Sequence, residues 1–90
     1  MPLVSVIVLG WGGEPYVARC LNALLRQTYA RCEIIVVDNA SPDRTAAIVE
    51  TDFPQVRLIR TPRNLGVAGG NNAGFRAAQG DILILTNVDT

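Results

Sequence analysis

The residues best suited to chemistry stand near the end of the chain, where Thr86-Asn87-Val88-Asp89 follows the apolar run 82–85. A short apolar run of this kind is typical of a strand buried on both faces, and it leaves the Asp89 carboxylate at the strand's end. Asn87 and Asp89 form an Asn-x-Asp element, whose side-chain oxygen atoms are hard ligands suited to a divalent cation. Because ligands of open parallel sheets bind beyond the carboxyl ends of the strands, we expect a ligand site around Asp89.

A second carboxylate, Asp38, follows the apolar run 33–37 and precedes Ser41-Pro42. Two roles are open to it. It can satisfy amide groups of its own loop, as aspartates at strand ends commonly do. Alternatively, it accepts a hydrogen bond from a base or a ribose.

Glycine and asparagine are concentrated in a segment that otherwise has helical character. Gly69, Gly70 and Gly74 lie inside it, and each costs roughly 0.8 to 1.0 kcal/mol relative to alanine in a helix interior. The glycines either let a ligand approach, with Asn71 and Asn72 supplying amide groups, or let the helix pack tightly on a sheet. The sequence leaves both explanations open.

The composition excludes several kinds of site. The 90 residues suffice for one domain, and they are 49% hydrophobic and 18% charged with a formal net charge of zero. This balance argues against disorder and against binding to nucleic acid or an acidic membrane surface through bulk charge. All eight basic residues are arginine and histidine is absent. A phosphate-loop lysine, an imidazole base and a histidine ligand for zinc are therefore excluded, and carboxylates remain to hold any metal.

The two cysteines, Cys20 and Cys32, have neither CxxC spacing nor a second pair. Zinc binding and redox chemistry are therefore unsupported, and we expect buried free thiols of a reduced cytoplasmic domain. The sequence shows no signal peptide and no apolar run of about 20 residues, so we expect a cytoplasmic location.

Strand and helix patterns alternate along the chain. The predicted strands are 3–9, 33–37, 56–60 and 81–85, and the predicted helices are 15–27, 42–51 and 67–79. Pro15 is expected to open the first helix, and Ser41 to be the N-cap of the second with Pro42 at its first position. This alternation predicts a Rossmann-like parallel α/β sheet with right-handed crossovers and strand order 3-2-1-4.

That strand order fixes the expected layers. The first two helices lie on one face of the sheet and the third on the other, with a crevice between strands 1 and 4. Gly10, Asp38 and Asp89 are expected to rim this crevice. Strand 4 is expected to be an unprotected apolar edge, which favours pairing with a second copy as a homodimer.

Three segments of the sequence together resemble the nucleotide-sugar half of a family 2 glycosyltransferase of the GT-A fold. They are 36–41 (VVDNAS), 63–74 (RNLGVAGGNNAG) and 85–89 (LTNVD). The resemblance runs along all 90 residues. It implies a truncated GT-A fold, with 1–90 as a single donor-binding subdomain.

The resemblance also implies roles for individual residues. Asp38 would hydrogen-bond the nucleotide base, and Asp89 would hold Mn²⁺ or Mg²⁺ on the diphosphate of a UDP-, dTDP- or GDP-linked sugar. The remaining expected donor-binding residues are Asn39, Arg63, Asn64, Gly66, Asn71 and Asn87. The implied reaction is transfer of the sugar to an acceptor hydroxyl with inversion, in cell-surface polysaccharide biosynthesis.

The sequence departs from the family pattern in two places. Gly10 and Gly12 stand where members usually carry a polar residue, so only backbone groups of that loop are left for contacts. Family members also continue beyond Asp89 into an acceptor-binding half that supplies the catalytic base. We therefore expect the 90 residues to be inactive alone, and a longer form to associate with the inner face of the membrane.

Two other functions compete with this interpretation. Gly10-Trp11-Gly12-Gly13 after the first strand and Asp38 after the second mimic a dinucleotide-binding fingerprint, although its third glycine would fall at Pro15. The other alternative is a non-catalytic assembly module that associates through the edge of strand 4.

Overall fold

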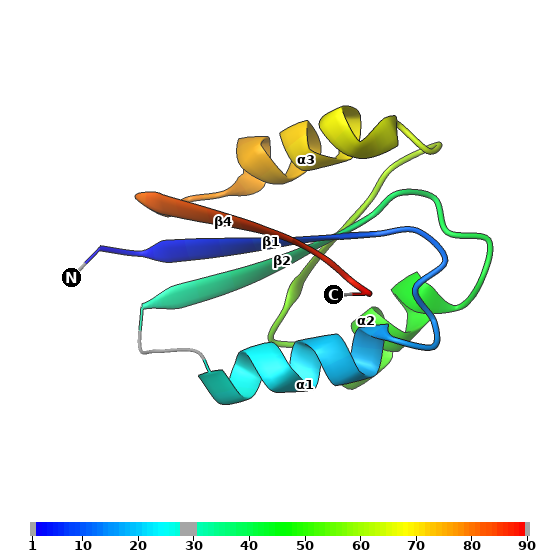
Figure 1. The fold of residues 1–90 in the computed structure, drawn as a ribbon, viewed down its shortest axis with the longest axis horizontal. Coiled ribbons are helices and arrows are strands. Elements are labelled where there is room, and N and C mark those ends of the chain that lie inside the picture. The colour runs from blue at the N-terminus through cyan, green and yellow to red at the C-terminus, as the bar shows by residue number, and fades with distance from the viewer. Residues whose placement is uncertain (1, 28–30, 90) are drawn as a thin grey trace.

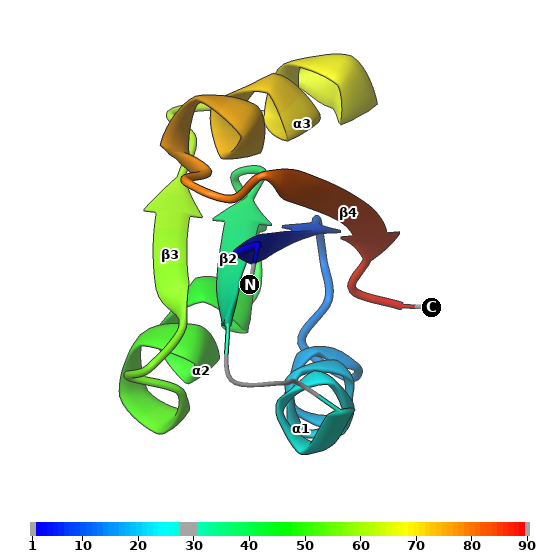
Figure 2. The same ribbon diagram turned by 90° about the vertical axis from the view of Figure 1, so that its left-hand side faces the viewer.

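The computed structural model describes residues 2–27 and 31–89 as a four-stranded parallel sheet with helices on both faces (Figure 1). The elements are β1 (Val4–Gly10), α1 (Val17–Gln27), β2 (Cys32–Asp38), α2 (Thr45–Asp52), β3 (Arg57–Arg60), α3 (Gly66–Ala77) and β4 (Ile82–Asn87). The strand order is β3-β2-β1-β4, which confirms the predicted Rossmann-like topology. Figure 2 shows α1 and α2 on one face and α3 on the other, also as predicted.

Two apolar cores hold these layers together. One lies under α1 and α2 and includes Val8, Leu21 and Val36, and the other lies under α3 and includes Ile7 and Ile35. All five side chains are fully buried, and each stabilises the fold by roughly 1.5 to 3 kcal/mol relative to an exposed position. The β-branched runs of β1 and β2 therefore form central strands covered on both faces.

The glycines of α3 bring its backbone close to the sheet. A Cβ on Gly70 would stand 2.4 Å from Leu9 Cδ1, and a Cβ on Gly74 would stand 2.5 Å from Ile7 Cγ2. Both glycines are buried. Of the two explanations open from the sequence, tight packing on the sheet is the one that the structure supports at these positions.

The predicted helix starts were wrong by a few residues. Helix α1 begins at Val17 rather than Pro15, after a turn in which the Gly13 carbonyl accepts hydrogen bonds from the N–H groups of Tyr16 and Val17. Helix α2 begins at Thr45, where Asp43 Oδ1 accepts a hydrogen bond from the Thr45 N–H at 3.0 Å. Ser41 is not its N-cap, because the Ser41 hydroxyl is bound to Asp38.

The other boundaries shift by one or two residues. Strands β1 and β2 each end one residue later than expected, β3 starts at Arg57, and β4 runs on to Asn87. Helix α3 spans Gly66–Ala77, because the backbone is already extended at Ala78 (φ −69°, ψ 135°). In the described part of the chain, none of the three helices has the length and apolar character to cross a bilayer.

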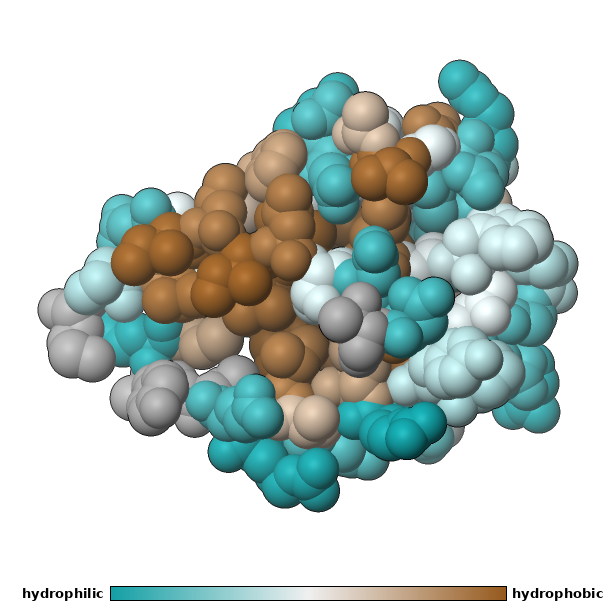
Figure 3. All heavy atoms as spheres, viewed as in Figure 1, coloured by the Kyte–Doolittle hydropathy of each residue, from teal (hydrophilic) through white to brown (hydrophobic). Residues whose placement is uncertain are grey.

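Strand β4 is the exposed apolar edge expected from the strand order, and it is not buried on both faces as its apolar run alone suggested. Its apolar side chains are 45–48% exposed, and they form much of the hydrophobic surface in Figure 3. They are Ile82, Leu83, Ile84 and Leu85. The cause is its place at the sheet edge, where only β1 pairs with it and the helices cover other strands. Cys20 and Cys32 are likewise only half-buried, although both thiols are free as predicted.

Candidate functional site

A cavity of about 350 Å³ opens at the carboxyl ends of β1 and β4, within the usual range for small-molecule sites. It is bounded by the loop after β1, the end of β2, the start of α3 and the turn after β4. Its lining residues are Leu9, Trp11, Gly12, Gly13, Tyr16, Asn39, Asn64, Gly66, Val67, Asn87, Val88 and Asp89. Five of the residues predicted from the sequence thus share one cavity: Asn39, Asn64, Gly66, Asn87 and Asp89.

Val88 fixes the direction of the last turn. Its N–H donates to the Leu9 carbonyl at 3.0 Å, one residue past the end of β4. Its side chain is 4% exposed and packs against Gly13. A Cβ on Gly13 would stand only 2.5 Å from Val88 Cγ1. Val88 thus anchors the turn on which Asn87 and Asp89 line the cavity together with Val88 itself. This role of Val88 and Gly13 was not predicted from the sequence.

Asp38 lies just outside the cavity lining. Its side chain is 4% exposed, and its Oδ1 accepts a hydrogen bond from the Ser41 hydroxyl at 2.5 Å. Its neighbour in the register is Gly10, which is also absent from the lining residues. Of the three residues expected to rim the crevice, only Asp89 therefore lines the cavity.

Asn39 connects the end of β2 to the start of α3. Its Oδ1 accepts hydrogen bonds from the Leu65 N–H at 2.9 Å and the Thr61 hydroxyl at 3.1 Å, and its Nδ2 donates to the Gly66 carbonyl at 3.0 Å. The side chain is 3% exposed. These bonds hold the loop before α3 against the sheet, which brings Asn64 and Gly66 to the cavity.

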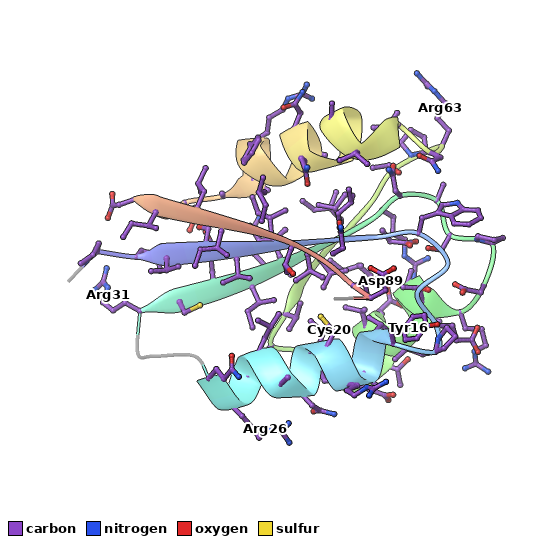
Figure 4. The ribbon with its side chains drawn as sticks, in the orientation of Figure 1. Tyr16, Cys20, Arg26, Arg31, Arg63 and Asp89 are labelled. Atoms are coloured by element: carbon purple, nitrogen blue, oxygen red, sulfur yellow. The ribbon has the colours of Figure 1, made fainter. Side chains whose placement is uncertain are left out.

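The other predicted donor-binding residues lie differently. Asn64 Oδ1 accepts a hydrogen bond from the Gly66 N–H at 2.8 Å, so its side chain shapes the start of α3. Arg63 is exposed and points away from the molecule (Figure 4). Asn71 is half-buried on α3. Neither Arg63 nor Asn71 is among the residues that line the cavity.

Two aromatic residues that line the cavity were not predicted from the sequence to belong to the site. Trp11 is 57% exposed and Tyr16 is 45% exposed, and both line the cavity. Trp11 lies in the glycine-rich loop after β1, where the Gly12 N–H donates to Ser41 Oγ at 2.9 Å. A tryptophan between glycines at the end of a predicted strand is the sequence signal that could have indicated this part of the site.

A second groove, of about 500 Å³, lies between α1 and β4 and shares Tyr16, Val88 and Asp89 with the first cavity. Cys20 of α1 also lines it. Figure 4 shows Asp89 above α1, the helix that carries Cys20. Burial raises the pKa of the Cys20 thiol, and the negative charge of Asp89 raises it further. The Asp89 carboxylate therefore acts electrostatically on the thiol in the second groove.

The donor atoms near Asp89 fit part of a metal site. The Asp89 carboxylate and the Asn87 amide supply oxygen ligands of the kind that Mg²⁺ and Mn²⁺ prefer. Among residues 2–27 and 31–89, no group of three or more His, Cys, Asp or Glu side chains gathers to hold a metal. The described residues thus fit a cation that also takes ligands from a bound phosphate or from water.

Residues 5–90 match the family model for glycosyl transferase family 2, and the chain belongs to this family. It is 39% identical over 82 residues to the uncharacterized glycosyltransferase EpsJ of Bacillus subtilis strain 168, covering 89% of this chain and 24% of EpsJ. It is 37% identical over 92 residues to the succinoglycan biosynthesis protein ExoO of Rhizobium meliloti strain 1021, covering 100% of this chain and 26% of ExoO. The chain thus spans about a quarter of the length of these relatives.

Solved structures agree with this assignment. The mannosyltransferase PcManGT from Pyrobaculum calidifontis, in complex with GDP-Man and Mn²⁺, superposes with a TM-score of 0.90 at 30% identity, over 98% of this chain and 28% of PcManGT. TarS 1-349 of S. aureus in complex with UDP-GlcNAc superposes with a TM-score of 0.86 at 29% identity, over 97% of this chain and 26% of that one. These matches confirm the predicted GT-A fold, and with the family match they decide against a dinucleotide-binding domain.

Proposed function

We propose that this chain is the donor-binding unit, residues 1–90, of a glycosyltransferase that moves a sugar from a nucleoside-diphosphate sugar to an acceptor hydroxyl with inversion. The observation that carries the proposal is that Asn39, Asn64, Gly66, Asn87 and Asp89 line the same cavity, at the carboxyl ends of β1 and β4. PcManGT in complex with GDP-Man and Mn²⁺ and TarS in complex with UDP-GlcNAc lend support from two relatives of the same fold.

In this proposal the nucleotide base binds near Asp38, between the aromatic wall of Trp11 and the loop of Asn64 and Gly66. The flat indole face of Trp11 suits a stacked base, because aromatic side chains stack on nucleobases with little dependence on sequence. Asn39 holds the loop, Asn87 faces the diphosphate, and Arg63 and Asn71 approach the donor only from the rim. The proposed donors are UDP-, dTDP- or GDP-linked sugars.

The chemistry requires stabilisation of negative charge as the nucleoside diphosphate leaves. A bound Mn²⁺ or Mg²⁺ would supply that stabilisation as a Lewis acid. Asp89 and Asn87 would hold the cation, and the cavity walls would orient the donor. The protein's own contribution is therefore binding and orientation of the donor.

We further propose that these 90 residues do not complete the reaction alone. Inversion needs a base to deprotonate the acceptor hydroxyl, and Asp89 is the only carboxylate among the described residues that line the cavity. In the relatives, about three quarters of the chain lies outside the matched region.

We propose a cytoplasmic location, at the inner face of the membrane in a longer form.

Calorimetric titration tests the donor-binding proposal. UDP, dTDP and GDP are titrated into the chain with and without Mn²⁺, and at least one should bind with metal-dependent affinity. D89N should weaken the metal-dependent binding about tenfold or more, since it removes the charged ligand. D52N is the matched control, because Asp52 is exposed at the end of α2, away from the cavity. Equal metal-dependent affinity of D89N and the unmodified chain would contradict the assignment of Asp89.

A transfer assay tests the second proposal. Residues 1–90 are incubated with nucleotide sugars, Mn²⁺ and added acceptors, and we expect nucleotide binding without product. Detectable glycosylation of an acceptor by this chain alone would refute the claim that it is inactive on its own.

A further inference from the structure

One hydroxyl group links the loop after β1, which lines the cavity, to the loop after β2. Ser41 Oγ donates to Asp38 Oδ1 at 2.5 Å and accepts a hydrogen bond from the Gly12 N–H at 2.9 Å. Asp38 ends β2, and Gly12 follows Trp11 in the loop after β1. Ser41 therefore connects the buried carboxylate to the loop that carries the exposed indole.

The same two loops are joined further along by a reciprocal pair of bonds. The Glu14 N–H donates to Asp43 Oδ2 at 3.2 Å, and the Arg44 N–H donates to Glu14 Oε1 at 2.9 Å. Both of these bonds are exposed to solvent. The bonds of Ser41 are partly buried, and buried hydrogen bonds are costlier to leave unmade.

The loop after β1 has little else to hold it on the Trp11 side. Trp11 is 57% exposed, so its indole contributes few core contacts. Gly12 has φ +66°, and a Cβ built on it would meet nothing within 4 Å. The position of this part of the loop therefore depends on hydrogen bonds rather than on side-chain packing.

We propose that Ser41 is a positioning residue for nucleotide binding. By holding the Gly12 N–H it keeps Trp11 at the cavity, and by its bond to Asp38 Oδ1 it ties that loop to the end of β2. The base would then meet an aromatic face whose position relative to the end of β2 is set by one hydroxyl. This inference rests on the proposed function for its ligand, a nucleoside diphosphate.

The chain contains a matched control for this serine. Ser5 is fully buried at the opposite end of the sheet, and its hydroxyl makes the same two kinds of bond. It donates to Glu33 Oε2 at 2.5 Å and accepts from the Gly80 N–H at 2.8 Å. S5A and S41A thus each remove one bond to a carboxylate and one bond from a glycine N–H.

Two readouts separate positioning from general stability. Trp11 is the single tryptophan of the chain, so its fluorescence reports the loop directly. S41A should weaken binding of the nucleoside diphosphate about tenfold and make Trp11 easier to quench with acrylamide. S41T keeps the hydroxyl and should restore both properties. S5A should lower the melting temperature without changing nucleotide affinity or quenching.

Each result decides for or against the role of Ser41. A folded S41A with unchanged affinity and unchanged quenching would overturn it, as would an equal loss of affinity in S5A. If S41A does not fold, S41C keeps the side-chain volume with a weak donor, and the same losses are expected of it relative to S41T. If the unmodified chain binds none of the nucleotides, the proposed function fails, while the quenching comparison still tests the link between Ser41 and the loop.

Discussion

Val88 is the residue on which the position of Asp89 depends. It is the buried member of the turn, and its methyl groups occupy the space that a side chain on Gly13 would need. Gly13 thus serves packing, since a Cβ there would stand 2.5 Å from Val88 Cγ1, whereas a Cβ on Gly10 would make an ordinary 3.4 Å contact with Val88. Asp89 lines the cavity next to Val88, whose hydrogen bond to Leu9 and burial fix the turn.

A double-mutant cycle tests this contact. G13A places a Cβ 2.5 Å from Val88 Cγ1, so it should destabilise the fold by about 1–3 kcal/mol through overpacking and should weaken metal-dependent nucleotide binding. Adding V88A removes the obstructing methyl groups, so the double variant should be more stable than the sum of the single effects predicts. Urea denaturation measures the free energies of unfolding, and strict additivity would contradict the contact.

At the scale of elements, a polar network at the other end of the sheet joins α3 to the strands. Glu33 of β2 accepts hydrogen bonds from the Ser5 hydroxyl at 2.5 Å and from the Gln79 N–H at 2.6 Å, and it pairs with Arg57 at 3.5 Å. Arg57 also donates to the Ala77 carbonyl at 2.8 Å. This network fixes the end of α3, and with it the start of β4, at a distance from the cavity.

The network predicts a pH dependence of stability. Burial raises the pKa of the Glu33 carboxyl, but the hydrogen bonds from Ser5 and Gln79 and the charge of Arg57 outweigh it and lower the pKa below its ordinary value. The stabilisation is therefore present above the unfolded pKa and is lost as the pH falls through the folded pKa. E33Q should destabilise the fold by about 1–2 kcal/mol at pH 7 and flatten the decline in acid.

Urea denaturation from pH 7 to pH 3 measures this effect, with E50Q as the control because Glu50 pairs with Arg60 at an exposed site. An acid profile of E33Q that parallels that of the unmodified chain would contradict the role of Glu33.

The helices and strands were predictable because their sequence patterns are local. The parts of the candidate site formed where two loops come together were not predictable. The apolar runs of β1 and β2 and the alternation of strands and helices were enough for the order β3-β2-β1-β4. Asn87 and Asp89 were predictable because any strand end in such a sheet faces the same edge. The role of Ser41 was missed because its partner Gly12 lies 29 residues away in sequence. Trp11 was missed for the same reason, because it lies next to Gly12 in the loop after β1.

At the scale of the whole molecule, the edge strand β4 presents a run of exposed apolar side chains. Its apolar residues are 45–48% exposed and lie beside one another on an outer strand (Figure 3). The run contains no charge, no proline and no bulge, which are the usual protections of an edge. We propose that it pairs with β4 of a second copy.

Sedimentation tests this proposal at high protein concentration. The unmodified chain should sediment as a dimer, and I84K should be monomeric, because it places a charge in the middle of the exposed edge. I84V keeps an apolar β-branched side chain and should remain dimeric. A monodisperse monomer for the unmodified chain would contradict pairing through β4.

In the proposed function, a nucleoside diphosphate binds at the carboxyl ends of β1 and β4. Amide chemical shifts of the ¹⁵N-labelled chain, measured during titration with GDP or UDP in the presence of Mg²⁺, locate the ligand residue by residue. Shifts are expected at Gly12, Asn64, Gly66, Asn87 and Asp89, which line the cavity, and not at Glu33 or Gln79 at the other end of the sheet. Unchanged cavity amides at saturating nucleotide, or shifts confined to the Glu33 end, would contradict the claim.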